Sequence, residues 1–460
     1  MSNSSFQRFA LLAGPILALL AGYLMYSANF SSEASVTLGT TVLCVVWWVF
    51  EPIPIPATSL IPLAVLPLLG VLTPAQVSGA YGHTLILLLL GGFILSTALE
   101  RNGAHRRIAL TMVRAFGGNS SRRLVFGFMA ASAMLSMWIS NTATTLMLLP
   151  VAMAVLEKSE DPDLAKPLLL GVAYAASVGG IGTPIGTPPN VIFMGVYEQL
   201  VGGRITFAGW MLWAVPVVLV LLPLVGLWLT RRLGHHAAPE VPEVGAWQPA
   251  EIRVLLIFAV TALLWITRKE PFGGWSELLG VTYSSDYMVA FIAVTAMFLV
   301  PDGRGERLLD WDTATGIPWG MLILFGAGIA IAEAFTQSGL SQTIGGLLSG
   351  LAILPVFLLM LCICLAVTFL TETTSNTATT TLLMPILAAG AMGAGMDPKL
   401  FMIPAAMSAS CAFMLPVATA PNVIVYSSGR FTVEAMAREG FALNLVGAVV
   451  IATLCYLLIA

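Results

Sequence analysis

The chain has 460 residues, of which 58% are hydrophobic and only 9% are charged, and its formal net charge is −3. Soluble globular proteins carry about 25% charged residues, so this composition excludes a water-soluble fold and indicates an all-α polytopic membrane protein. The five cysteines are scattered through apolar segments, and the four histidines form no metal-binding pattern. These features argue against a disulfide framework and against a metalloenzyme.

Apolar segments long enough to cross a bilayer recur along the chain. A spanning helix needs about 20 mostly apolar residues. The first such segment is longer than the roughly 7–15 apolar residues of a signal peptide, which favours a retained helix. We expect two long, broken spans at 166–200 and 399–427, whereas 121–157 and 353–390 are too long for one span. The continuous spans are expected near 9–27, 37–52, 57–72, 82–99, 207–229, 251–267, 286–300, 317–337 and 437–459.

Basic residues favour one orientation of these spans, because cytoplasmic loops of membrane proteins are enriched in Lys and Arg. Six arginines between residues 100 and 123 predict a cytoplasmic segment with an amphipathic helix on the membrane surface. The rule is satisfied if 121–157 and 353–390 are re-entrant hairpins, and it is hard to satisfy with thirteen ordinary spans. We therefore expect eleven spans and two hairpins, with the N-terminus in the cytoplasm and the C-terminus outside. The basic residues left outside are Arg204, Arg268, Lys269 and Lys399.

A polar hexapeptide, SNTATT, occurs twice in apolar surroundings, at 140–145 and at 375–380. The segment LILLLLGGFILSTALERNG at 85–103 resembles MLILFGAGIAIAEAFTQSG at 321–339, and PIGTPPNVI at 184–192 resembles PVATAPNVI at 416–424. Three matches in the same order indicate an internal duplication, and the expected topology makes the two halves inverted. Inverted repeats with interrupted helices at corresponding positions are typical of secondary transporters.

The repeated polar segments have chemistry that suits ions. Non-helical backbone is tolerated in a membrane only inside protein or beside a water-filled cavity. The end of one half-helix offers carbonyl oxygens to a cation, and the start of the next offers N–H groups to an anion. The proline-rich breaks at 179–190 and 414–422 cannot continue an α-helix. We expect one site from Ser140–Asn141–Thr142, Gly186–Thr187, Ser375–Asn376–Thr377 and Ala418–Thr419, with Ser136 and Thr371 behind it as possible cation ligands.

The paired SNT motifs, the two proline-rich breaks and the inverted duplication resemble the divalent-anion:sodium symporter family over nearly the whole chain. The resemblance implies a homodimer with an elevator mechanism, in which both hairpins belong to the moving domain. It implies one Na⁺ at Ser136, Ser140, Asn141 and Gly186, and a second at Thr371, Thr374, Asn376 and Ala418. It also implies that substrate carboxylates contact Asn141, Thr142, Thr187, Asn376, Thr377 and Thr419. One departure is Ala420, where family members often have proline, and it weakens the contacts implied on that side.

The resemblance also predicts domains and function. Residues 1–120 and 251–352 would form a scaffold, 121–230 and 353–460 a transport domain, and 231–250 a cytoplasmic linker. We expect Na⁺-coupled symport of C4-dicarboxylates (succinate, malate, fumarate) into the cell across the inner membrane, with Na⁺ as the coupling ion. The alternatives are a citrate or sulfate symporter and a dicarboxylate exchanger. The expected partners are a small dicarboxylate anion, sodium ions, the lipid bilayer and a second copy of the chain, and no nucleic acid.

Other interpretations of the same residues are weaker. Ser, Thr and Asn often only join membrane helices, at about 0.6 kcal/mol per hydrogen bond, but the repetition of the hexapeptide favours a site. A hydrolase nucleophile at Ser140 or Ser375 would need a base, and no His or Lys stands near either serine, so we expect no enzyme. A channel is disfavoured because one chain supplies an inverted pair. Glu372 is either functional, as ionisable groups at membrane depth often are, or satisfied structurally by neighbouring hydroxyls.

Overall fold

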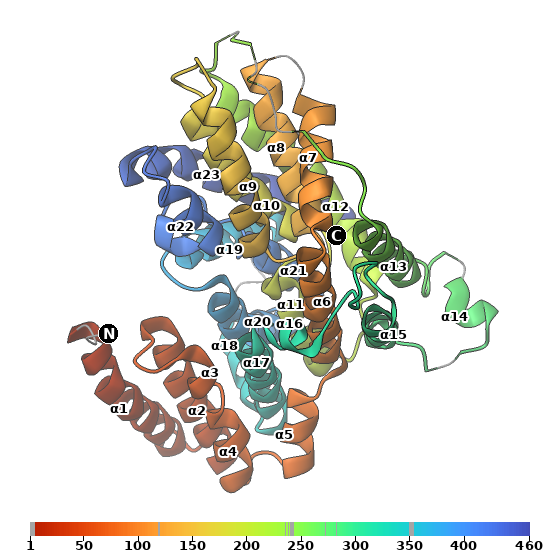
Figure 1. Ribbon diagram of the computed structural model, residues 1–460. Helices are drawn as coiled ribbons and strands as arrows, with labels where there is room; N and C mark the ends of the chain where they lie inside the picture. The colour runs from red at the N-terminus through yellow and green to blue at the C-terminus, as the bar shows by residue number, and fades with distance from the viewer. Residues whose placement is uncertain are drawn as a thin grey trace.

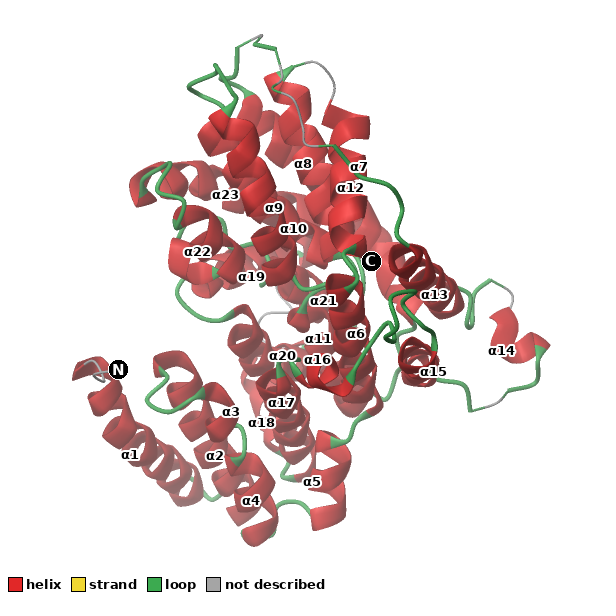
Figure 2. Ribbon diagram, viewed as in Figure 1, coloured by secondary structure: helices red, strands yellow, loops and turns green. Residues whose placement is uncertain are grey.

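Helices make up nearly all of the regular structure in the computed structural model, as Figure 2 shows. The structure describes residues 5–117, 120–234, 236–237, 239, 243–271, 273–281, 283–348 and 354–460. Within these ranges the only β-structure consists of two isolated bridges. The predicted all-α fold is therefore confirmed. The predicted domain boundary at 352–353 and parts of the predicted linker 231–250 lie outside the described residues.

The helices of the first half follow the predicted order of spans, hairpin and broken span. Thr73 begins α5 with a capping box that includes Gln76, and prolines stand at the first turn of several helices, where the missing N–H is harmless. The helices are α1 Ser5–Ser27, α2 Ser32–Phe50, α3 Ile55–Thr58, α4 Ile61–Leu68, α5 Pro74–Tyr81, α6 Thr84–Arg101, α7 Ala104–Gly117, α8 Ser121–Ser136, α9 Asn141–Glu157, α10 Ala165–Gly180, α11 Pro188–Val201 and α12 Phe207–Thr230.

The second half repeats this order from α17 onward, so that α17–α23 correspond one by one to α6–α12. This correspondence is what an internal duplication predicts. The helices are α13 Pro249–Ile266, α14 Gly274–Leu278, α15 Asp286–Leu299, α16 Trp311–Thr315, α17 Trp319–Gln337, α18 Leu340–Leu348, α19 Val356–Thr371, α20 Asn376–Gly393, α21 Lys399–Ser408, the 3₁₀ turn η2 Pro416–Ala418, α22 Ala420–Tyr426 and α23 Val433–Ile459.

Both predicted hairpins are helix pairs joined by short non-helical tips. The first tip is residues 137–140 between α8 and α9, and the second is residues 372–375 between α19 and α20. Both predicted broken spans are also interrupted, between α10 and α11 and between α21 and α22. The hexapeptide of each half therefore begins at the N-terminus of a helix, as the sequence predicted.

One predicted span is not a continuous helix. Segment 57–72 is divided into α3 and α4, because prolines before and within these helices prevent one regular helix. Segment 286–300 forms the single helix α15, which ends one residue earlier than predicted. Seven helices in the described part of the chain are long and apolar enough to cross a membrane alone.

Helix α10 lies at the centre of one group of helices. In Figure 1, α8, α9 and α12 pack against α10 in the upper part of the molecule, and α1–α5 lie with α17 in the lower part. Every residue of α10 from Pro167 to Gly180 is buried. The hydroxyl of Tyr174 donates a hydrogen bond to the carbonyl oxygen of Phe413 at 2.6 Å, so the core joins the two halves of the repeat.

Charged residues that were predicted to lie on opposite sides of the membrane gather at two separate places. At one, Arg107 Nε lies 2.7 Å from Glu251 Oε2, and Arg101 pairs with Glu306 at 2.6 Å, so the segments predicted to be cytoplasmic meet. At the other, a cavity of about 310 Å³ is lined by residues predicted to be external, among them Arg204, Arg268 and Lys269.

Candidate substrate and cation site

A cavity of about 610 Å³ lies where the two hairpin tips and the two broken spans meet. The rest of the wall comes from α2, α6 and the segment before α17, through residues such as Val49, Phe93 and Pro318. The six predicted carboxylate contacts all line the cavity: Asn141, Thr142, Thr187, Asn376, Thr377 and Thr419. Four predicted Na⁺ ligands also line it: Ser140, Gly186, Thr374 and Ala418. The structure therefore brings together residues as far apart in the chain as Ser140 and Thr419.

The first tip is organised around Asn141. The hydroxyl of Ser136, which is fully buried behind the tip, donates to Asn141 Oδ1 at 2.5 Å. The side-chain oxygen of Ser140 accepts from the backbone N–H of Ala143 at 3.1 Å and so caps α9. No described residue bonds to Asn141 Nδ2, so this amide group is left as a donor at the cavity.

The second tip repeats this arrangement around Asn376. The hydroxyl of Thr371 lies 2.7 Å from Asn376 Oδ1 and 3.1 Å from the carbonyl oxygen of Ala409. The hydroxyl of Thr374 lies elsewhere: it bonds to the carbonyl oxygen of Leu370 at 2.8 Å and to Thr379 Oγ1 at 2.6 Å. Thr374 lines the cavity, but its hydroxyl is already bonded within the hairpin rather than to Asn376.

The cavity can hold an anion without a basic side chain. Glu51 is the only charged residue among the described residues that line it. Helices α9 and α20 begin at its wall, and the positive ends of their dipoles point toward it. Their first N–H groups and the hydroxyls of Thr142 and Thr377 are donors there, whereas the two prolines that begin α11 have no N–H to offer.

Oxygen atoms crowd around two glycines in the first half, as a small cation requires. A Cβ built on Gly186 would lie 2.4 Å from the carbonyl oxygen of Gly180 and 3.0 Å from that of Ser136. A Cβ built on Gly180 would lie 2.6 Å from Asn141 Oδ1 and 3.2 Å from the carbonyl oxygen of Gly186. Side chains are thus excluded from a space that is lined by carbonyl and amide oxygens, the donor set that fits Na⁺ and that the predicted first ion site requires.

Two buried asparagines form hydrogen bonds across the interruptions of the broken spans, a role that was not predicted from the sequence. Asn190 Nδ2 donates to the carbonyl oxygens of Gly180, Ile181 and Thr183 at 3.0, 3.3 and 2.7 Å. Asn422 Nδ2 donates to those of Ala412 and Leu415, both at 3.0 Å. Each amide satisfies carbonyl groups that the break leaves without helical partners. Both residues stand in the repeated PPNVI and APNVI motifs, which was the available signal.

Glu372 has a structural role in the second half. Its carboxylate accepts hydrogen bonds from the backbone N–H groups of Met414 and Leu415 at 2.9 and 3.0 Å and from Asn444 Nδ2 at 2.7 Å. It is 3% exposed and is absent from the cavity wall. The structural alternative for Glu372 therefore applies, with backbone and amide donors in place of hydroxyls.

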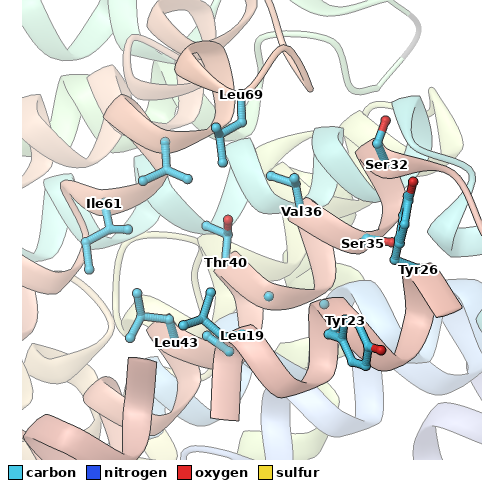
Figure 3. Close-up of a pocket in the computed structure, with 14 residues that line it drawn as sticks. Leu19, Tyr23, Tyr26, Ser32, Ser35, Val36, Thr40, Leu43, Ile61 and Leu69 are labelled. Carbon is cyan, nitrogen blue, oxygen red and sulfur yellow. The ribbon is translucent and has the colours of Figure 1, made fainter. Parts of the chain in front are cut away.

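A second cavity of about 480 Å³ lies between α1, α2 and α4, but its lining does not suit an anion. Figure 3 shows Leu19, Val36, Leu43, Ile61 and Leu69 around it, and no predicted site residue takes part. A largely apolar lining is what we expect between membrane helices whose outer side chains are apolar.

Comparisons with known proteins identify the family and the fold of the chain. The family model described as the sodium:sulfate symporter transmembrane region matches residues 6–459. The sodium-dependent dicarboxylate transporter SdcS of Staphylococcus saprophyticus is 38% identical over 98% of this chain and 91% of its own length. SdcS of Staphylococcus aureus strain NCTC 8325 is 39% identical over the same shares. The crystal structure of the Alcanivorax borkumensis YdaH transporter has a TM-score of 0.59 at 16% identity, covers 84% of this chain and 87% of that chain, and shows the same fold.

Proposed function

The chain belongs to the sodium:sulfate symporter family, and from this premise we propose that it is a secondary transporter that couples Na⁺ entry to the uptake of C4-dicarboxylates. The relatives named sodium-dependent dicarboxylate transporter cover almost the full chain at 38–39% identity. This function is symport rather than an enzymatic reaction, and Na⁺ is its coupling ion.

One observation carries the proposal: two asparagines, each bonded through its Oδ1 to a buried hydroxyl, line one cavity whose described lining contains no Lys or Arg. A dianion that enters a site without a fixed positive charge loses its hydration, and no opposite charge in the protein compensates for that loss. Two opposite unit charges 4 Å apart attract each other by about 4 kcal/mol at an effective dielectric constant of 20. Sodium ions bound beside the substrate supply this attraction and leave with it, which couples the two movements.

We assign the first Na⁺ to Ser136, Ser140, Asn141 and Gly186, and the second to Thr371, Asn376, Ala418 and Thr374. The glycine pair at Gly180 and Gly186 supports the first assignment, and the Thr371–Asn376 contact supports the second. Thr374 would have to release its bond to Thr379 before it could bind an ion. The substrate carboxylates are assigned to Asn141, Thr142 and Thr187 on one side and to Asn376, Thr377 and Thr419 on the other.

We also propose an orientation and a movement. The N-terminus lies in the cytoplasm and the C-terminus outside, as the contacts of Arg101 and Arg107 support by joining segments of the predicted cytoplasmic side. The cavity is bordered by the end of α2 and the segment before α17, which lie toward that side, so this conformation corresponds to an inward-facing state. Residues 121–230 and 353–460 would carry the site past the scaffold in an elevator movement, within a homodimer in the inner membrane.

Uptake of radiolabelled succinate into proteoliposomes tests the proposal. An inward Na⁺ gradient should drive uptake, and a matching K⁺ gradient should not. Unlabelled malate and fumarate should compete more strongly than citrate or sulfate. Equal uptake with either cation would contradict symport and indicate an exchanger or a uniporter, and no uptake with either would refute the dicarboxylate assignment.

A further inference from the structure

Glu51 is an acidic residue on the wall of a cavity that we assign to an anion. It is the only charged residue among the described residues that line this cavity, and its side chain is exposed. No described residue forms a hydrogen bond or ion pair with its carboxylate. An unneutralised carboxylate at this place opposes the binding of a free dianion, so its presence needs a physical reason.

The backbone of Glu51 is held at the end of α2 in a conformation that side chains rarely adopt. Its φ and ψ are 46° and 50°, in the left-handed region that favours Gly or Asn at a helix C-terminus. Its N–H donates to the carbonyl oxygen of Trp47 at 3.0 Å, and its own carbonyl oxygen accepts from Gln7 Nε2 at 3.2 Å. Capping the helix does not require a glutamate. Residues in this conformation often serve functional sites.

Glu51 lines the same cavity as the binding elements but belongs to a different part of the chain. It belongs to the segment 1–120 that we assign to the scaffold, whereas Asn141 and Asn376 belong to the proposed transport domain. Its charge therefore acts on whatever the tips hold, without being part of either proposed ion site. A dianion alone would bring two negative charges toward it, and a dianion with two sodium ions would bring none.

We infer that Glu51 is a charge-selecting residue of the scaffold, which attracts Na⁺ into the cavity and repels a dicarboxylate that is not neutralised by Na⁺. This inference rests on the proposed function. This role explains how a site without fixed cations avoids transporting the anion alone. Glu51 repels the dianion without Na⁺, whereas the dianion with two sodium ions carries no net charge and is not repelled. Glu51 thus enforces coupling through electrostatics rather than by contact.

The test uses the full-length protein in detergent, with two measurements. The first is the Na⁺ concentration that gives half of the Na⁺-induced rise in melting temperature, without substrate. The second is succinate binding at zero and at saturating Na⁺. In Glu51→Gln, we expect the Na⁺ midpoint to rise about three- to tenfold and Na⁺-free succinate binding to strengthen by a similar factor, as the loss of one partly screened charge predicts.

Two further variants separate charge from backbone geometry. Glu51→Asn also removes the charge but suits the left-handed conformation, so it should behave like Glu51→Gln. Glu51→Asp keeps the charge and should stay close to the wild type. The difference between wild type and Glu51→Gln should shrink as choline chloride rises from about 0.05 M to about 0.5 M, because the Debye length shortens.

An unchanged Na⁺ midpoint and an unchanged Na⁺ requirement in Glu51→Gln would overturn the inference. Equal losses in Glu51→Asp and Glu51→Gln would also overturn it, because they would indicate a structural role. The outcome is separate from that of the proposed function: a wild-type protein that fails to bind succinate refutes the dicarboxylate assignment, whereas the Na⁺ midpoints measured without succinate still decide the role of Glu51.

Discussion

The two halves of the repeat share an arrangement around two asparagines and differ in the side chains that surround it. Both place a hydroxyl against the side-chain oxygen of an asparagine, at Asn141 and at Asn376. Both also hold the neighbouring break open with a buried asparagine, Asn190 or Asn422. The parts that stayed alike since the duplication are thus the parts to which we assign the ions and the substrate.

The helix caps differ between the halves. In the first half, Ser140 caps α9, whereas Thr187 before α11 makes no side-chain cap bond. In the second half, Ser375 before α20 makes none, whereas Thr419 accepts from Asn422 N at 3.3 Å. The hydroxyl without a cap bond therefore belongs to Thr187, in the broken span, in the first half. In the second half it belongs to Ser375, at the hairpin tip.

The space for a cation differs as well. Gly180 and Gly186 of the first half correspond to Ala412 and Ala418 of the second half, so two methyl groups occupy the equivalent region. The break is also braced differently, since Thr183 donates to the carbonyl oxygen of Met137 in the first half and Glu372 accepts from Leu415 in the second. These differences predict two ion sites of unequal affinity and lead to the following tests.

The largest effect is expected from removing either central asparagine. Asn141→Ala and Asn376→Ala should each lower Na⁺-driven succinate uptake by at least about 100-fold. Each change removes an oxygen that we assign to Na⁺ and an amide donor that we assign to the substrate. Both variants should remain folded, as gel filtration in detergent would show. The matched control is Ser427→Ala, an exposed hydroxyl away from the cavity. Normal transport in both asparagine variants would contradict the site.

The next test compares the two ion sites directly. Gly186→Ala places a methyl group 2.4 Å from the carbonyl oxygen of Gly180, which forces the cradle to shift. We expect the Na⁺ concentration for half-maximal uptake to rise about tenfold or more, as the loss of about 1.4 kcal/mol or more of binding free energy would produce. The reverse change in the other half, Ala418→Gly, should alter it by less than about threefold. Equal effects would mean that the two ion sites do not differ in the way proposed.

A smaller effect on stability is expected from Glu372→Gln. The carboxylate accepts three hydrogen bonds, and glutamine has only one acceptor oxygen, so at least one buried donor loses its partner. We expect a loss of about 1–3 kcal/mol in the free energy of unfolding, measured as a lower melting temperature in detergent. Glu157→Gln, at an exposed position at the end of α9, is the control. If Glu372→Gln left stability unchanged but abolished uptake, Glu372 would be functional instead.

The smallest effects should separate the two threonines before the second half-helices. Thr187→Val removes a hydroxyl that has no capping role, so it should raise the KM for succinate about three- to tenfold without lowering the melting temperature. Thr419→Val removes a cap and should cost about 1 kcal/mol of stability. A loss of stability in Thr187→Val would show that the caps are equivalent after all.

The sequence predicted the breaks because they are local features. Prolines and glycines at 179–190 and 414–422 interrupt a helix wherever it lies, and the repeated hexapeptide marked both tips. The side-chain partners were less predictable because they depend on distant segments. Asn444, which binds Glu372, lies 72 residues further along the chain.

The differences from prediction also have physical causes. The hydroxyl of Thr374 bonds to Thr379 one helical turn into α20, a rotamer choice that no motif specifies. The apolar length of segment 57–72 predicts one helix, but its prolines divide it into two. Glu51 was not a candidate in the sequence because it follows a span outside the repeated segments, and only the fold brings it to the cavity.

The most direct test of the account is an experimental structure of the protein with succinate and saturating Na⁺. We expect substrate density between the two tips, with one carboxylate near Asn141 and Thr142 and the other near Asn376 and Thr377. It also predicts ion density beside the Gly180–Gly186 cradle. Substrate density held by only one tip, or outside the cavity altogether, would contradict the two-half site on which the proposed function depends.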